Sequence, residues 1–177
     1  MASIQVQKAT SSDNKEVKQP QNGAQVVVVN QTKSVMTLGR QINWSGTPAY
    51  PGYPDTIWPN QKVIFNHLAD GDFGSTAAVI YNGTNLTGQP CAWVLAWDAP
   101  AESERKPNKV FVTCGSKSQI DNLENNEIRH FLSESSKHSF TFDPAAQVSA
   151  QAIINEKLPN KAYVGAGFGA GHDNKLL

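Results

Sequence analysis

The sequence predicts an all-β fold with one short helix, built as a single antiparallel β-sandwich. Residues 77–81 and 91–97 are strand-like runs that are apolar on both faces, which is typical of strands in a sheet that is covered on both sides. The strand-like runs follow one another along the chain with short turns between them, as in a meander. These observations favour a sandwich or a closed barrel over a parallel α/β sheet.

Nine segments combine apolar alternation or a continuous aliphatic run with turn residues at their ends, and each is expected to form a strand. In chain order they are residues 26–29, 34–42, 61–68, 77–81, 91–97, 109–114, 139–142, 148–154 and 162–164. Between the sixth and the seventh strand, residues 117–134 change to the periodicity of a helix with one apolar side. Ser118 is the expected N-cap of this helix.

The chain of 177 residues suffices for one domain with a proper core, and we expect three parts. Residues 1–23 are predicted to be a mobile polar arm, because they hold few large aliphatic side chains. Residues 24–164 form the expected sandwich domain. Residues 165–177 are rich in glycine and are predicted to be a tail rather than a phosphate-binding loop, since no helix follows to supply an anion site.

Charge and hydropathy exclude several classes of function. The 15 Lys and Arg residues balance the 15 Asp and Glu residues without forming a basic cluster, which argues against a nucleic-acid partner. No run approaches the roughly 18 apolar residues that a transmembrane segment needs. The N-terminal region resembles neither a signal peptide nor a transit peptide, so we expect a soluble, cytoplasmic protein.

The two cysteines lie on runs that are expected to pair as a hairpin. Pairing Trp97 with Asn108 would place Cys91 opposite Cys114. A reducing compartment favours free buried thiols, and whether the two are ever bonded stays open. Because further Cys or His ligands are not nearby, the pair cannot complete a zinc site, and the sequence indicates neither a metal nor a cofactor.

The strongest candidate for a binding site is the segment 44–60. Its prolines and glycines exclude a helix or a central strand, so we expect a long loop at one end of the scaffold. Aromatic side chains that carry one polar atom each suit sugar faces, choline-like headgroups or a bilayer interface. The loop holds four of them, Trp44, Tyr50, Tyr53 and Trp58. The alternative is that these rings fold back as a lid on the core.

Two carboxylates, Asp70 and Asp72, lie at a turn after the third expected strand. They are expected to assist the aromatic loop as hydrogen-bond acceptors for a ligand. A calcium loop is not indicated, because Gly74 and Ser75 occupy positions where further ligands would stand. No catalytic residues are predicted, since the histidines lack metal-type spacing and no serine has a visible base. We therefore do not expect an enzyme.

Several short motifs follow one another in the middle of the chain. They are Pro54-x-x-Ile57-x-Pro59-Asn60-Gln61, Phe65-x-His67, Gly74-Ser75-Thr76-Ala77-Ala78-Val79-Ile80-Tyr81, Trp93-Val94-Leu95-Ala96-Trp97 and Asn108-Lys109-Val110-Phe111-Val112. This order resembles the plant 23-kilodalton jasmonate-induced protein family, and residues 27–46 extend the similarity. The N-terminal arm, which lacks a helical segment, and the glycine-rich tail depart from the family pattern. The resemblance implies a plant stress or defence protein without an assigned enzymatic activity.

A more distant similarity concerns the fold. The Pro-rich aromatic loop, the strand that ends at Tyr81 and the strand end Trp97-Asp98-Ala99-Pro100 are similar to actinoporin-like sandwiches, including aegerolysins and nakanori-type lectins. Those proteins bind membrane lipids or glycans. The amphipathic N-terminal helix that pore formers insert is not evident in residues 1–23, so the similarity implies an actinoporin-like sandwich that recognises its ligand without forming pores.

The residues and the resemblance together predict a non-catalytic recognition protein. Its expected partner is a glycan or a phospholipid headgroup, captured by the aromatic rings of the loop. The alternative is a structural or protein-interaction protein whose aromatic loop lies in a homo-oligomer interface. A hydrolase would need a polar cleft with a perturbed titratable pair, which the sequence does not show.

Overall fold

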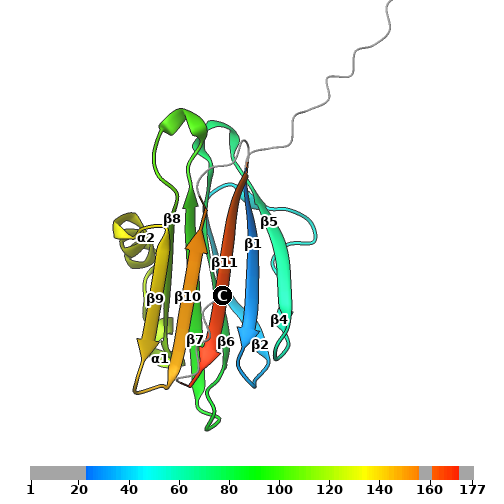
Figure 1. Ribbon diagram of the computed structural model, residues 1–177, viewed down its shortest axis with the longest axis vertical. Helices are drawn as coiled ribbons and strands as arrows, with labels where there is room; N and C mark the ends of the chain where they lie inside the picture. The colour runs from blue at the N-terminus through cyan, green and yellow to red at the C-terminus, as the bar shows by residue number, and fades with distance from the viewer. Residues whose placement is uncertain (1–22, 156–160, 172–177) are drawn as a thin grey trace, which may run out of the picture.

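Two β-sheets lie face to face in the computed structural model, which describes residues 23–155 and 161–171 (Figure 1). The first sheet has the strand order β3-β5-β1-β11-β10-β9, and the second has the order β4-β2-β6-β7-β8. In chain order the strands are β1 (Gly23–Gln31), β2 (Met36–Ser45), β3 (Thr47–Pro48), β4 (Thr56–Ile57), β5 (Lys62–Leu68), β6 (Ser75–Thr84), β7 (Pro90–Ala99), β8 (Lys109–Ser116), β9 (His138–Asp143), β10 (Val148–Ile154) and β11 (Lys161–Ala170). The predicted β-sandwich is confirmed.

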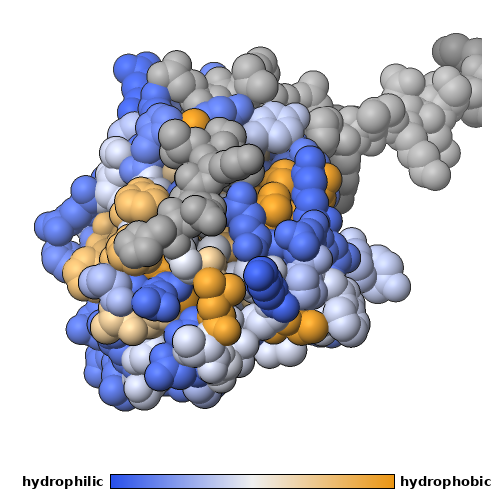
Figure 2. All heavy atoms as spheres, turned by 60° about the horizontal axis from the view of Figure 1, so that its bottom comes forward, coloured by the Kyte–Doolittle hydropathy of each residue, from blue (hydrophilic) through white to orange (hydrophobic). Residues whose placement is uncertain are grey.

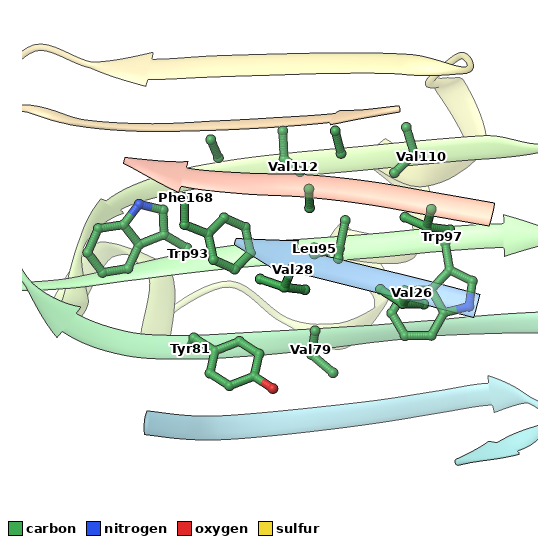
Figure 3. Close-up of a cluster of buried hydrophobic side chains, with 14 of the residues drawn as sticks. Val26, Val28, Val79, Tyr81, Trp93, Leu95, Trp97, Val110, Val112 and Phe168 are labelled. Atoms are coloured by element: carbon green, nitrogen blue, oxygen red, sulfur yellow. The ribbon is translucent and has the colours of Figure 1, made fainter. Parts of the chain in front are cut away.

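The five-stranded sheet is covered on both faces, as residues 77–81 and 91–97 predicted. Trp93 and Trp97 point toward the six-stranded sheet and have no exposed surface (Figure 3). Trp93 lies beside Phe168 of the opposite sheet, with ring centroids 6.4 Å apart. On the other face, small and aliphatic side chains of β6 and β7 pack against two helices. Large rings therefore fill the space between the sheets, while small residues let the helices approach closely.

The helical stretch expected at residues 117–134 is confirmed, but it is divided into α1 (Lys117–Asp121) and α2 (Asn125–Glu134). The break lies at a capping box. The backbone amide of Glu124 donates a hydrogen bond to the Glu127 side chain at 2.8 Å, and Glu124 caps α2 in return. A cap inside a continuous apolar pattern ends one helix and starts the next.

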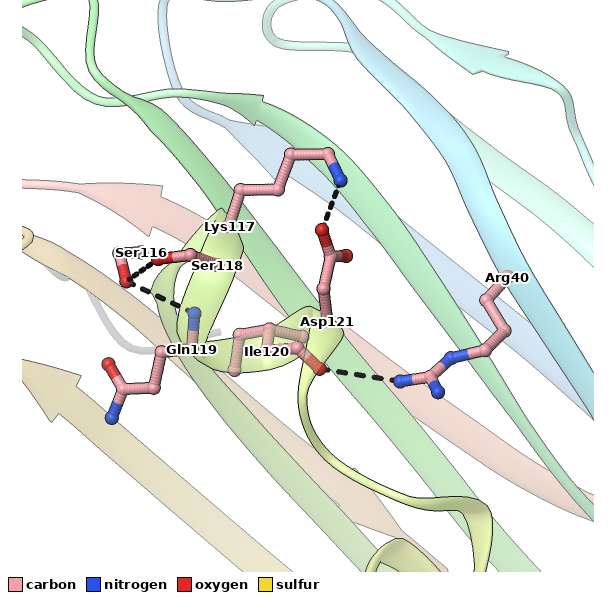
Figure 4. Close-up of polar contacts among 7 residues, drawn as sticks. All are labelled: Arg40, Ser116, Lys117, Ser118, Gln119, Ile120 and Asp121. Atoms are coloured by element: carbon pink, nitrogen blue, oxygen red, sulfur yellow. Dashed lines mark hydrogen bonds and ion pairs between the residues drawn. The ribbon is translucent and has the colours of Figure 1, made fainter.

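The short helix α1 is anchored to the five-stranded sheet (Figure 4). Ser116 caps it, because its Oγ accepts a hydrogen bond from the backbone amide three residues further on, at 3.3 Å. The predicted cap, Ser118, lies inside the helix instead. The Arg40 guanidinium of β2 donates hydrogen bonds to the carbonyls of Ile120 and Leu123 at 3.3 and 2.9 Å. Arg40 thus joins the end of α1 to β2, and the Ile120 carbonyl also accepts a hydrogen bond from the backbone amide of Leu123 at 3.1 Å.

The glycine-rich segment begins as a strand and not as the predicted tail. Residues 165–170 form the second half of β11, in the middle of the six-stranded sheet. Ala166 and Phe168 point into the core and are fully buried, while the glycines that alternate with them lie on the other face of the sheet. The prediction failed because a strand whose outer positions are glycine shows only half of the usual alternation. Residues 1–22 and 172–177, which belong to the predicted arm and tail, lie outside the described residues.

The first and the last strand of the described chain lie side by side. β1 pairs with β11 in parallel, with Gly23 opposite Lys161, whereas the other strand pairs of the described chain are antiparallel. β1 also pairs with β5, so it is an interior strand of the sheet. The sheet is therefore complete only when both ends of the domain meet.

The hairpin of β7 and β8 has a different register from the predicted one. Cys114 lies opposite Trp93, so the expected pairing of Cys91 with Cys114 is wrong by two residues. Asn108 does not pair with Trp97, because the register of the two strands is shifted by two residues. Its side chain donates a hydrogen bond to the carbonyl of Asn155 at 2.8 Å. A shift of two leaves every side chain on its expected face. Both thiols are free and buried.

Candidate binding site

The predicted aromatic loop starts later than expected, because Trp44 is part of β2. Trp44 is half-buried and packs against the apolar cluster between the five-stranded sheet and the helices. The preceding residue, Asn43, points to the opposite face, where it contacts Tyr53. The structure therefore separates Trp44 from the other three predicted rings.

Residues 46–61 connect the edges of the two sheets. β3 pairs with β5 at the edge of one sheet, and β4 pairs with β2 at the edge of the other. Pro48 fits an edge strand, since proline has no amide hydrogen to give to a neighbouring strand. The amide of Ala49 donates a further hydrogen bond to the carbonyl of Asn66 at 2.9 Å. The loop therefore closes one side of the sandwich and is anchored at both of its ends.

Tyr53 points inward from this loop, as the lid alternative expected. It is 7% exposed, and its hydroxyl donates a hydrogen bond to Asn43 Oδ1 at 2.5 Å. Its ring stacks on the His67 ring at a centroid distance of 6.2 Å and meets Phe65 edge-on at 5.3 Å. Burial raises the pKa of the Tyr53 hydroxyl, with a smaller contribution from Tyr81, so the residue stays neutral.

A chain of polar groups continues from Tyr53 through the exposed residue Asn43 into the core. His67 Nε2 lies 3.2 Å from Asn43 Oδ1, and His67 Nδ1 lies 2.8 Å from Ser75 Oγ. Trp97 Nε1 donates to the same Ser75 Oγ at 3.1 Å. Since Asn43 Oδ1 only accepts, the neutral His67 carries its proton on Nε2, and Ser75 donates to Nδ1. Burial lowers the pKa of His67 to about 4, which agrees with a neutral imidazole.

The contact between Ser75 and His67 has the distance of a nucleophile and its base, but its position favours a structural role. Both side chains have no exposed surface. A serine that a substrate cannot reach does not act as a nucleophile, and the lowered pKa of His67 makes it a weak base. No local sequence pattern indicates this pair, because the two side chains come from β5 and β6, on either side of a turn.

A hollow of about 340 Å³ lies against the outer side of the same loop. Tyr50 stands at its border with a 99% exposed side chain. Prominent among the lining residues are Tyr50, Pro51, Tyr53, Asp55, Ile64 and Asn66. An aromatic ring, a carboxylate, an amide and an aliphatic side chain thus meet in one place. This volume lies within the range of small-ligand sites.

Sequence reasoning missed the part of the hollow that β5 provides. Ile64 and Asn66 share the outward face of β5, and Ile64 is 56% exposed. Their alternation was visible in the sequence, but nothing local shows that β5 would pair with β3 and so lie beside Tyr50. Asp55 was missed for the same reason, because its role follows from the path of the loop.

The remaining predicted ligand residues do not line the hollow. Trp58 is 61% exposed at the turn after β4, where its backbone amide donates to Gln61 Oε1 at 2.8 Å. Asp70 is exposed at the turn after β5. The Asp72 side chain lies outside the described residues, and its role stays a prediction. Of the four predicted rings, only Tyr50 and Tyr53 therefore meet at one site.

Within residues 23–155 and 161–171, no three His, Cys, Asp or Glu side chains gather in a way that could hold a metal ion. Over the same residues, no helix has the length and apolar character that crossing a membrane requires.

Comparison with known proteins first defines the fold. The lipid-binding protein Nakanori superposes with a TM-score of 0.69 at 18% identity, over 84% of this chain and 71% of that one. The Xerocomus chrysenteron lectin superposes with a TM-score of 0.51 at 10% identity, over 83% of this chain and 99% of that one. The chain thus has the β-sandwich fold of these two proteins, which confirms the distant similarity noted in its sequence.

A comparison of sequences then defines the family. No family model matches the chain. It is 38% identical over 152 residues to the jasmonate-induced protein homolog of Atriplex canescens, which covers 85% of this chain and 82% of the relative. The chain belongs to the jasmonate-induced protein family, as its ordered motifs indicated.

Proposed function

We propose that this protein is a non-catalytic recognition protein of the plant stress response, and that it binds a glycan or a lipid headgroup in the hollow beside Tyr50. The name of the Atriplex relative supports induction by jasmonate, and the two structural neighbours are a lipid-binding protein and a lectin. The residues around Tyr50 supply the chemistry that either ligand requires.

One observation carries this proposal: an aromatic ring that is 99% exposed stands beside a hollow, on a loop anchored to both sheets. Exposing a tyrosine ring fully gains nothing for folding, whereas a ring held in place offers a stacking surface at a low entropic cost. The apolar face of a sugar stacks on such a ring, and a quaternary ammonium group binds it through a cation–π interaction.

The polar residues of the hollow narrow the choice of ligand. The Asp55 carboxylate and the Asn66 amide can bind sugar hydroxyls, and Asp55 also attracts the positive charge of a choline group. An anionic headgroup would be repelled by Asp55. We therefore expect neutral sugars or choline headgroups to bind, and free phosphate not to bind.

The variant Tyr50→Ala tests the proposal, with Phe73→Ala as the matched control. Phe73 is 71% exposed and does not line the hollow, so its removal deletes an exposed ring without touching the site. Binding to a glycan array and to phosphatidylcholine vesicles should fall at least about tenfold in Tyr50→Ala and stay unchanged in Phe73→Ala. Equal binding by wild type and Tyr50→Ala would refute the proposed site.

The homo-oligomer alternative rests on the same exposed ring. A stable interface needs a contiguous apolar surface. Figure 2, which turns the lower end of the sandwich toward the viewer, shows hydrophobic side chains in separate patches on that face. Light scattering over a dilution series decides between the two: an interface protein dissociates on dilution, and Tyr50→Ala would then weaken the assembly.

The cytoplasmic location expected from the N-terminal sequence is also part of the proposal. A fusion with a fluorescent protein at the C-terminus, observed in plant cells, should give a diffuse cytoplasmic signal. Secretion into the cell wall would contradict this location and would favour an extracellular glycan as the ligand.

A further inference from the structure

The strand β5 is paired along only part of its outer side. On its inner side it pairs with β1 along its whole length. On its outer side β3 covers its last two residues, and the amide of Ala49 donates a hydrogen bond to the carbonyl of Asn66. Beyond Ala49 the chain turns away from β5 as a loop (Figure 1). Among the described residues, no strand pairs with the outer side of residues 62–65.

The backbone groups of Lys62 and Ile64 point toward this open side. In an antiparallel sheet, the amide and the carbonyl of one residue point to the same neighbouring strand, and the direction alternates along the chain. The carbonyl of Asn66 points away from β1, since it accepts from the loop, whereas the carbonyl of Gln61 points to β1 and accepts from one of its residues at 3.0 Å. Lys62 and Ile64 alternate with Gln61 and therefore point outward. Within residues 23–155 and 161–171, their outward amides and carbonyls have no backbone partner.

The open side of β5 is accessible, because the hollow beside Tyr50 lies against it. Ile64, Phe65 and Asn66 all line that hollow. Side chains of consecutive strand residues point to opposite faces, so three in a row line one hollow only along the edge of the strand. Ile64 is 56% exposed, and Lys62 is exposed as well. The open edge therefore faces a free space of about 340 Å³.

The edge of β5 is regular, whereas the matching edge of the other sheet is not. The register of β5 with β1 runs without interruption. On the other sheet, β2 has two irregularities in its pairing with β6, at residues 38–40 and 43–45. Bulges of this kind twist an edge and hinder pairing with a further strand. Of these two strands, β5 thus has the geometry that a new strand needs.

The size and chemistry of this edge fit an extended peptide rather than a folded domain. The open stretch of residues 62–64 is about 10 Å long. Tyr50 stands beyond one of its ends and Trp58 lies at the turn before the other, and both rings are exposed. These rings hinder the approach of a second copy of the protein, whereas a single extended chain fits between them. Backbone amides and carbonyls in strand register are complementary to another backbone and not to a sugar or a headgroup.

We propose that the open edge of β5 binds an extended peptide segment of another protein, which adds one antiparallel strand to the six-stranded sheet. Ile64 and Lys62 each exchange two hydrogen bonds with this segment. The peptide residue opposite Ile64 shares its outward face, where a β-branched side chain packs well. The residue opposite Lys62 is acidic, because Lys62 has no ion pair in the part of the chain that the structure describes. The site uses the backbone of β5 and not the Tyr50 ring, so it goes beyond the proposed function.

The probe is the acetylated and amidated hexapeptide Thr-Lys-Val-Thr-Glu-Thr, with its valine opposite Ile64 and its glutamate opposite Lys62. Binding to the wild-type protein is measured by NMR, where the amide signal of Ile64 should shift and its exchange with solvent should slow. One variant peptide carries an N-methyl group on the valine, and another carries it on the threonine that follows. The first loses a donor that faces β5 and should bind at least about tenfold more weakly, whereas the second should bind within about twofold.

A pair of protein variants provides the matched control. Ile64→Pro removes the outward amide, which takes no part in the pairing with β1, so the protein should fold. Ile64→Val keeps both the amide and a β-branched side chain. We expect peptide binding to fall at least about tenfold in Ile64→Pro and to stay within about twofold in Ile64→Val. Lys62→Glu should also weaken binding, and a peptide with lysine in place of its glutamate should restore it.

The N-methyl peptides decide the outcome on the wild-type protein, whether or not Ile64→Pro folds. No binding at about 1 mM peptide, or equal losses with the two N-methyl peptides, overturns the proposal. Slow exchange of the Ile64 amide in a dimer of the free protein also overturns it, because a second copy then occupies the edge. These results leave the proposed function standing, since glycan and vesicle binding are tested separately with Tyr50→Ala. Weaker binding of the N-methyl-valine peptide alone supports the added strand.

Discussion

Replacing Tyr53 with alanine should destabilise the protein strongly, whereas the same change at Tyr50, in the same loop, should not. Tyr53 is 7% exposed and lies edge-on against Phe65, while Tyr50 is 99% exposed. Truncating a buried aromatic side chain to alanine costs about 3 to 5 kcal/mol. Truncating a fully exposed one changes stability by about 0.5 kcal/mol or less.

The variant Tyr53→Phe separates the hydroxyl from the ring. It keeps the stacking on His67 and removes the hydrogen bond to Asn43, whose Oδ1 retains its contact with His67 Nε2. The net contribution of one such hydrogen bond is about 1 kcal/mol. The packing of the ring therefore accounts for the remaining 2 to 4 kcal/mol, about two thirds or more of the total.

Thermal and urea unfolding, followed by the fluorescence of the buried Trp93 and Trp97, measure these changes. For a domain of this size, 1 kcal/mol shifts the midpoint by about 2 to 4 °C. We expect losses of about 6 to 20 °C for Tyr53→Ala, about 2 to 4 °C for Tyr53→Phe and less than about 2 °C for Tyr50→Ala. If Tyr53→Ala stayed within about 1 kcal/mol of wild type, the inward packing of the loop would be wrong.

Three further predictions follow from groups described above. Between pH 7 and pH 4 the free energy of unfolding should fall by about 3 kcal/mol because of His67. In the unfolded chain this histidine takes up a proton near pH 6.5, whereas in the folded protein, with a pKa of about 4, it does so only at lower pH. A His67→Gln variant should show a flatter dependence of its urea midpoint on pH. Gly52→Ala should lower the free energy of unfolding by about 1 to 2 kcal/mol, because this residue has a positive φ of 104°. Gly46→Ala should lower it more, since its Cβ would lie 2.2 Å from a backbone oxygen. Equal losses for the two variants in denaturant unfolding would contradict this. Burial raises the pKa of Cys91 and raises that of Cys114 to about 12, so both thiols should react with dithionitrobenzoate only after unfolding. Rapid labelling of the native protein would contradict the buried positions of the two thiols.

Much of the sandwich could be predicted from local patterns. Residues 77–81 and 91–97 carry apolar side chains on both faces, and this pattern reports burial on both sides without reference to any partner. The pairing of β1 with β11 could not be predicted in this way, because it joins segments from opposite ends of the domain. The second half of β11 was missed as well, since its outward glycines carry no side-chain signal.

The candidate site shows the same limit more clearly. Tyr50 and Tyr53 are the same residue type in one loop, but one stands free and the other is a lid on the core. What distinguishes them is the presence of Asn43 and His67 under Tyr53, and these belong to β2 and β5. A sequence shows which residue types a loop offers, and the partners brought in by other strands decide which of them remain available for a ligand.

The position of β1 between β5 and β11 has a consequence for synthesis of the protein. A ribosome releases β1 long before it releases β11, so the amino-terminal strand has an unpaired edge while most of the chain emerges. Contacts between such distant segments form late, because a large loop must close first. A chain that terminates prematurely, before residue 161, lacks the strand that joins β1 to β10, and it cannot assemble the six-stranded sheet.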